Sequence, residues 1–274
     1  MGTTLPPLGL GIGWRPELAH FIDQREGLGF VEVIAEGLNP DGPLPDPLEL
    51  LRERGVKRVL HGISLSLGSA EGVDGRRLDA LAKLAERTGA TLVSEHVCFV
   101  RSGKVESGHL LPVPRTREML EVLVENVEEA RRALPVPLAL ENIATLVEWP
   151  NPEFDEPTFL RELLGRTDCG LLLDLANLHA NARNHGWDPL GYLEKLPLER
   201  VAYVHMAGGV ERGGRYHDTH AHPLPPEPLE LLRRLCERAK PPGVMLERDA
   251  RFPPPGELGA ELDAIAAAFG RLGR

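Results

Sequence analysis

Cysteine is scarce in this chain of 274 residues, which contains three and no CxxC pair. Cys98, Cys169 and Cys236 fall in predicted strands or helices, and we expect them to be buried thiols. An odd, widely spaced set disfavours both a disulfide framework and a thiolate zinc site.

Lysine is also rare, at five of the 31 basic residues, and the net charge is -10. Binding to nucleic acid depends on clustered Lys and Arg that displace counterions from phosphates. The basic residues here are dispersed along an acidic chain. We therefore predict no nucleic-acid partner.

Long hydrophobic runs are absent: no stretch approaches the roughly 18 apolar residues of a membrane span. The first 14 residues lack the basic region and apolar stretch of a signal peptide. We expect a cytoplasmic protein without a membrane partner. Hydrophobic residues at 42% and charged residues at 26% are typical of a globular chain.

Short apolar, β-branched runs alternate with helix-patterned segments, as in parallel βα units. We predict eight such strands, at residues 8–13, 30–35, 57–63, 91–97, 136–143, 169–175, 201–207 and 244–247. The helical pattern is plainest at 76–88, 115–134, 229–239 and 257–272. No glycine-rich phosphate motif follows the first strand, which disfavours a dinucleotide-binding sheet. The pattern predicts an α/β fold: one TIM (β/α)₈ barrel domain over residues 1–274.

The longer connections fall where a TIM barrel places its catalytic loops, after strands. They span residues 37–47, 101–114, 144–157 and 208–228. Function is therefore expected at the end of the barrel where the strands terminate.

Metal-binding residue types stand at the ends of six successive predicted strands, and such positions converge at the mouth of a parallel barrel. A buried carboxylate costs several kcal/mol unless it is paired, hydrogen-bonded or bound to a metal. One such residue alone could be a satisfied core histidine or half of an ion pair, but six together favour a metal cluster. The six are His61, His96, Glu141, Asp174, His205 and Glu247.

The segment after the seventh predicted strand adds Asp218 and His220. In an extended D-x-H both side chains point to the same side and could chelate a metal. His217 and His222 would face away or lie further along and are weaker candidates. Eight candidate ligands exceed the four that one zinc needs, so we predict two or more ions bridged by a carboxylate such as Glu141.

Two asparagines are candidates for roles beside the metal ligands. Asn142 could orient a substrate, although an asparagine at a strand end often only caps a turn. Asn177 is a poor ligand but could orient a bound water or a carboxylate by hydrogen bonding. The ligand set, with imidazole and carboxylate but no thiolate, suits iron, manganese or zinc.

Several ordered motifs carry a resemblance over nearly the whole chain. They are GLGIGWR, HGISLSLG, SEH, LEN, LLLDLANL with NHGWDP, VHMAGG, DTHAHP and LERD. In them the chain resembles the DUF692 family, also called UPF0276, which is grouped as multinuclear non-heme iron-dependent oxidative enzymes. The resemblance implies a xylose-isomerase-like TIM barrel with two or three irons held by the eight candidate ligands. Asn177 stands where some members carry a histidine, which bears first on the third metal position.

The resemblance also implies an activity. Characterised relatives use dioxygen to modify cysteine or other residues of ribosomally made precursor peptides, commonly with a small partner protein that presents the peptide. It thus implies ferrous or ferric iron as cofactor, with zinc or manganese as alternative occupants. Two other classes stay open: a divalent-metal sugar isomerase, epimerase or phosphodiesterase-like barrel enzyme, and a non-catalytic metal-binding module.

Overall fold

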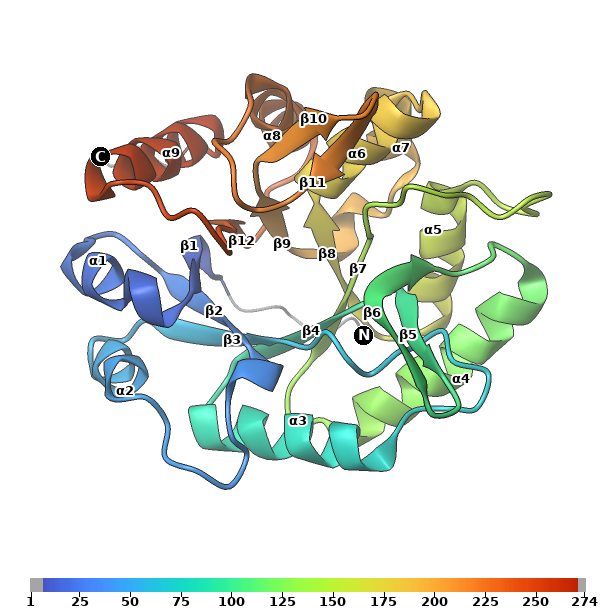
Figure 1. Ribbon diagram of the computed structural model, residues 1–274, viewed down its shortest axis with the longest axis horizontal. Coiled ribbons are helices and arrows are strands. Elements are labelled where there is room, and N and C mark those ends of the chain that lie inside the picture. Colours follow the sequence, from blue (N-terminus) through green and yellow to red (C-terminus); the bar gives the residue numbers. More distant parts are fainter. Residues whose placement is uncertain (1–6, 271–274) are drawn as a thin grey trace.

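Eight parallel strands close into a barrel in the computed structural model, which describes residues 7–270 (Figure 1). The last strand pairs with the first, Gly9 opposite Gly243, and so completes the ring. The barrel strands are β1 (Gly9–Trp14), β2 (Phe30–Ile34), β3 (Lys57–His61), β4 (Leu92–His96), β7 (Leu138–Glu141), β8 (Gly170–Asp174), β9 (Val201–Met206) and β12 (Gly243–Leu246). Each overlaps one predicted strand, and the predicted TIM barrel is confirmed.

Helices surround the barrel, as the alternation predicted. They are α1 (Ala19–Gln24), α2 (Asp46–Glu53), α3 (Gly75–Thr88), α4 (Arg117–Ala133), α5 (Glu156–Arg166), α6 (Leu175–His185), α7 (Pro189–Lys195), α8 (Pro226–Arg238) and α9 (Pro255–Ala268), with 3-10 turns η1 (Pro16–Leu18), η2 (Ala35–Gly37) and η3 (Leu198–Arg200). Local sequence defines the ends of α3, where Asp74 accepts hydrogen bonds from backbone amides of the first turn and Gly89 adopts a left-handed conformation.

The barrel strands are buried on both faces, and this explains their near-continuous apolar sequences. Leucines of the helices pack on the outer face in one large core. Inside the barrel, Phe30, Val59, Leu92, Tyr203 and Met245 belong to a second cluster. This apolar layer leaves the ends of the strands above it for polar side chains.

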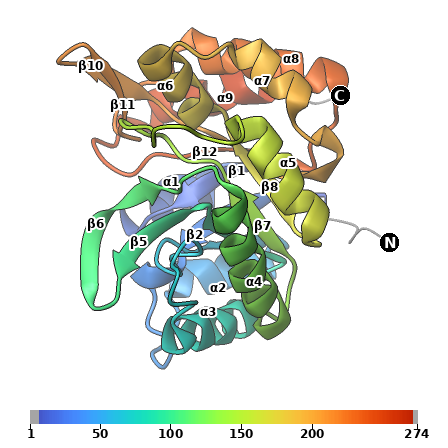
Figure 2. The same ribbon diagram turned by 90° about the vertical axis from the view of Figure 1, so that its right-hand side faces the viewer.

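Two connections that the sequence suggested were loops contain β-hairpins. β5 (Cys98–Ser102) pairs with β6 (Val105–Pro112), and β10 (Gly209–Arg212) pairs with β11 (Arg215–Asp218). Gly213 and Gly214 both have positive φ, as a two-residue hairpin turn needs. Figure 2 shows both hairpins projecting on the same side of the molecule.

Cys98 and Cys169 are buried and Cys236 is half-buried, and none of the three forms a disulfide, in agreement with the expectation of unbridged thiols. Among residues 7–270, no helix combines the length and the apolar character needed to cross a membrane.

Asn126 of α4 forms hydrogen bonds to the backbone of the segment that follows β3. Its buried amide nitrogen donates to the carbonyl oxygens of Leu67, at 2.7 Å, and Ser69, at 2.9 Å. We expect Asn126→Ala to lower the free energy of unfolding by about 1–3 kcal/mol, because two buried carbonyls lose their donor. Chemical denaturation measures the loss. Glu129→Ala, at an exposed position of the same helix, is the control and should change stability by less than about 0.5 kcal/mol; equal effects would contradict the prediction.

Candidate metal centre at the barrel mouth

Strand register brings the predicted ligands together at one end of the barrel. His96 lies opposite Glu141 in the β4–β7 pair, and Asp174 lies opposite His205 in the β8–β9 pair. His61 ends β3, the neighbour of β4. All five are buried, with exposed fractions of 6% or less.

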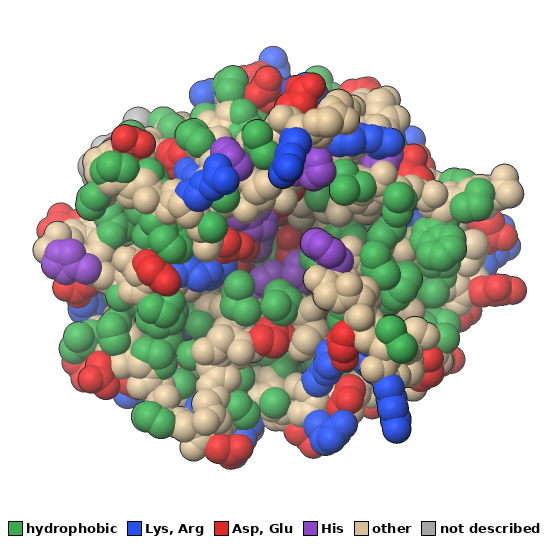
Figure 3. Space-filling view, viewed as in Figure 1, with side chains coloured by type: hydrophobic (Ala, Val, Ile, Leu, Met, Phe, Trp, Pro, Cys, Tyr) green, Lys and Arg blue, Asp and Glu red, His purple; other side chains and the backbone are tan. Residues whose placement is uncertain are grey.

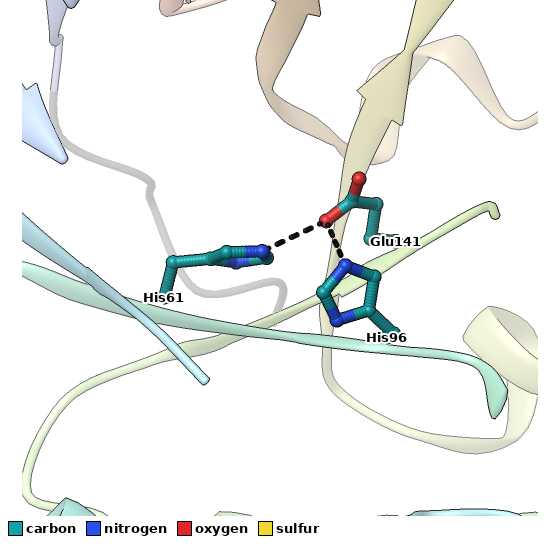
Figure 4. A group of neighbouring side chains, drawn as sticks. All are labelled: His61, His96 and Glu141. Carbon is teal, nitrogen blue, oxygen red and sulfur yellow. Dashed lines mark ion pairs between the residues drawn. The ribbon is translucent and has the colours of Figure 1, made fainter. Parts of the chain in front are cut away.

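Glu141 is the centre of this arrangement. Its Oε2 lies 3.4 Å from His61 Nε2 and 3.3 Å from His96 Nε2 (Figure 4). Its Oε1 lies 3.6 Å from His205 Nδ1. One carboxylate therefore faces imidazoles on both of its oxygens, which is the geometry of a group that bridges two cations.

His205 joins this first group to a second. Its Nδ1 lies 3.1 Å from Glu247 Oε2 and 3.7 Å from Asp174 Oδ2. Glu247 Oε1 lies 3.4 Å from the Nδ1 of His220, whose Nε2 contacts Asp218 directly. The structure thus brings the candidate ligands of the later strands to the same site.

Four overlapping groups among the described residues could each hold a metal ion, because their ligand atoms lie within 4.8 Å of one another. Seven of the eight predicted ligands belong to them, and Asp218 touches a member. The groups are His61, His96 and Glu141; Glu32, His205 and Glu247; Glu141, Asp174 and His205; and Asp174, His220 and Glu247.

The predicted D-x-H geometry is wrong in its backbone conformation. His220 has a φ of 50°, so the segment turns there and is not extended. The two side chains still meet, because the turn after β11 folds the ring of His220 back onto Asp218. His217 bonds to the Arg212 backbone, and His222 bonds to Thr219, so neither belongs to the four groups.

The two asparagines have defined contacts. Asn142 Nδ2 donates to the Asp174 carbonyl and its Oδ1 accepts from the Asp174 amide, both at 2.9 Å. These bonds tie the end of β7 to the end of β8 and favour a positioning role over the predicted orientation of substrate. Asn177 Nδ2 lies 3.4 Å from Glu141 Oε1, and its backbone amide donates to Asp174 Oδ1 at 2.7 Å. Asn177 thus contacts two of the predicted carboxylate ligands.

Sequence reasoning missed Glu32, which lies inside β2 and is fully buried. Its Oε2 lies 2.8 Å from His205 Nε2, on the opposite edge of the ring from Glu247. The signal was a carboxylate in the middle of the apolar strand FVEVI. Because the sequence analysis considered only the ends of strands, it did not identify Glu32.

Two more carboxylates support the histidines. Glu95, fully buried, has Oε1 3.7 Å from His96 Nδ1. Asp249 Oδ2 lies 3.0 Å from His220 Nδ1 and also pairs with Arg15. Glu95 directly precedes the predicted ligand His96 in the SEH motif, and Asp249 follows the predicted ligand Glu247 by two residues in LERD. The sequence therefore showed that both lie near ligands but did not show what they contact.

Burial and the charges of neighbouring side chains strongly shift the pKa values of residues in the cluster. Burial opposes ionisation of Glu141, but His96 and His205 outweigh it and lower the pKa of that carboxyl to about 2. Burial likewise opposes protonation of His96, yet Glu141 and Glu95 raise its pKa to about 9. Burial raises the pKa of Asp174 to about 7. The imidazoles are thus held in a field that strongly favours positive charge.

Unpartnered buried atoms point into the cluster. Among the described residues, Glu141 Oε2, Asp174 Oδ2, His205 Nδ1 and Asp218 Oδ1 have no hydrogen-bond partner. Isolated buried lone pairs are costly, whereas a cation would satisfy several at once. The donor chemistry, imidazole nitrogen and carboxylate oxygen, fits iron, manganese or zinc.

A cavity of about 480 Å³ opens onto the cluster. Apolar side chains of Ile34, Ile63, Val100 and Leu110 line part of its wall, and charged Glu36, Arg77 and Glu106 line another part. Figure 3 shows this end of the molecule hollowed, with histidine and acidic side chains inside the hollow. A side chain of a larger molecule could therefore reach the cluster from outside.

Solved structures share the fold. Endonuclease IV from Thermus thermophilus aligns with a TM-score of 0.59 at 23% identity, over 96% of this chain and 99% of that one. D-psicose 3-epimerase from Clostridium cellulolyticum aligns with a TM-score of 0.61 at 12% identity, over 96% and 99%. At these identities the likeness establishes a common barrel fold alone.

Sequence relatives are much closer. A UPF0276 protein from Streptomyces avermitilis is 53% identical over 277 residues, which cover 98% of this chain and 57% of that longer protein. One from Caulobacter vibrioides is 40% identical over 276 residues, 98% of each chain. The family model described as "RiPP precursor modification enzyme MbnB/TglH/ChrH" matches residues 9–269. The chain therefore belongs to the UPF0276 proteins and to this family, whose name refers to ribosomally synthesised and post-translationally modified peptides (RiPPs).

Proposed function

We propose that this protein is an oxygen-dependent, multinuclear non-heme iron enzyme that modifies residues, cysteine first, of a ribosomally made precursor peptide. The observation that carries the proposal is the central position of Glu141, which faces imidazoles on both carboxylate oxygens and lines a cavity of about 250 Å³. Membership of a family of RiPP precursor modification enzymes supports the substrate class. A small protein that presents the peptide is the expected partner.

The proposed metal ligands are the eight that the sequence indicates, arranged around Glu141. Bound iron would supply redox chemistry and a position for a substrate thiolate. The protein's own part is to bind, orient and exclude water. Asn177 holds the carboxylates of Glu141 and Asp174 by hydrogen bonds, and Asn142 ties the backbone at the end of β7 to that at the end of β8.

The cavity wall supports a peptide side chain as the incoming group. The apolar side chains Ile63 and Leu110 line the approach to the cluster and would displace water from it. Charged wall residues are already engaged, since Arg77 pairs with Glu106 and Glu36 accepts from Ser64 at 2.5 Å. A compact, uncharged or thiol-bearing side chain fits such an approach better than a polyanion.

Glu141→Gln tests the bridging role. The amide keeps the shape but removes the negative charge shared by two sets of imidazoles, so the variant should retain at least one metal ion fewer per chain. Mass-spectrometric metal analysis of protein purified without oxygen measures this. Glu156→Gln is a matched control: Glu156 is a partly buried carboxyl outside the cluster that accepts from Tyr192 at 2.9 Å. Wild-type metal content in Glu141→Gln would contradict the bridge.

Oxygen dependence is tested by metal replacement. Metal-free protein reconstituted anaerobically with ferrous iron should consume oxygen when a cysteine-containing peptide is added, and the peptide mass should change. Zinc-loaded protein should do neither, because zinc has no redox chemistry. Full activity with zinc alone, or turnover of a sugar without oxygen, would overturn the proposal.

A further inference from the structure

A line of buried polar groups runs beneath the metal centre and joins two of its histidines. His61 Nδ1 lies 2.8 Å from Ser94 Oγ, which lies 2.7 Å from Tyr203 Oη. Tyr203 Oη donates to Glu32 Oε2 at 2.5 Å, and Glu32 Oε2 lies 2.8 Å from His205 Nε2. All five side chains are at most 2% exposed. We call Ser94, Tyr203 and Glu32 the linking triad.

The carboxylate of Glu32 sets the direction of every hydrogen bond in this line. An ionised carboxylate only accepts, so Tyr203 must donate to it, and so must His205 through Nε2. Tyr203 Oη then accepts the hydrogen of Ser94, because its own hydrogen is already used. Ser94 Oγ in turn accepts from His61 Nδ1.

The outcome is a defined tautomer for each histidine. With the proton of His61 on Nδ1, its Nε2 lone pair points to Glu141 Oε2, 3.4 Å away. With a proton of His205 on Nε2, its Nδ1 is the nitrogen left to face Glu247. A metal-binding histidine needs this division, with one nitrogen donating to a fixed partner and the other open to the ion.

We propose that the linking triad positions His61 and His205 as metal ligands, with His61 binding through Nε2 and His205 through Nδ1. The inference rests on the proposed function only in taking these two histidines as ligands. Glu32 acts here as an acceptor, not as a ligand beside Glu247. The two carboxylates face opposite nitrogens of one ring, so an ion at Nδ1 lies across the ring from Glu32.

Removal of the Tyr203 hydroxyl releases the constraint. In Tyr203→Phe, Ser94 is free to donate to His61 Nδ1, 2.8 Å away, which is nearer than its other acceptor, the Leu60 carbonyl oxygen at 3.4 Å. This favours the tautomer of His61 with its proton on Nε2, where the metal should bind. The aromatic ring at position 203 remains in this variant. In the wild type it packs edge-on against the rings of Phe30 and His205, with distances between ring centroids of 5.8 and 5.3 Å. Ser94→Ala removes the acceptor of His61 directly, with a side chain that fits the space.

The experiment is a titration of the metal-free full-length protein with Co²⁺ alone, followed by its visible absorption bands. Tyr203→Phe and Ser94→Ala should each weaken the binding of one cobalt about 10-fold and alter its bands. The double variant should lose little more than either single one, because both act on the same proton of His61.

Tyr192→Phe is the matched control. Tyr192 is also buried and its hydroxyl also donates to a glutamate, Glu156, but this pair lies outside the cluster. The Tyr192→Phe variant should bind cobalt with wild-type affinity, even if the substitution lowers thermal stability.

Wild-type cobalt affinity and bands in both Tyr203→Phe and Ser94→Ala would overturn this inference and leave the proposed function intact. An equal loss in Tyr192→Phe would also overturn it, by indicating a general effect of a lost buried hydroxyl. Failure of the wild-type protein to bind cobalt at all would overturn the inference and the metal-dependent function together.

Discussion

Carboxylates and imidazoles crowd one end of a barrel that is otherwise apolar, and their charges must be neutralised there. Glu141 stands at the centre, with His61 and His96 facing one oxygen and His205 facing the other. Without cations, protons on the imidazoles have to balance the carboxylates, as the raised pKa of His96, about 9, indicates. The same field that retains protons is the field that attracts metal ions.

The rest of the site is arranged around this concentration of charge. Strand ends supply the rigid part, whereas Asp218 and His220 come from a hairpin and the turn after it. Below the cluster, Glu32 meets the outer edge of His205, so the polar contacts extend down to the layer next to the apolar interior. Above it, a cavity lined by both apolar and charged side chains opens to the outside.

The comparison with other barrels separates fold from chemistry. Endonuclease IV and D-psicose 3-epimerase align with this chain at TM-scores of 0.59 and 0.61, yet their names describe different reactions. A TIM barrel presents strand-end side chains at one mouth regardless of the reaction, so function depends on the site and its surroundings. Here the surroundings are the two hairpins and the acceptors placed around the histidines.

The sequence alone determined the eight barrel strands and most of the candidate ligands, because strand ends of a parallel barrel converge whatever the details of packing. His61, His96, Glu141, Asp174, His205 and Glu247 could be found in this way. Tertiary structure decided the rest. Glu32 and Tyr203 meet from strands 171 residues apart, and only strand register and barrel closure bring them together. The turn at His220 likewise depends on a backbone conformation that residue spacing does not reveal, since a positive φ for a non-glycine residue is imposed by its surroundings.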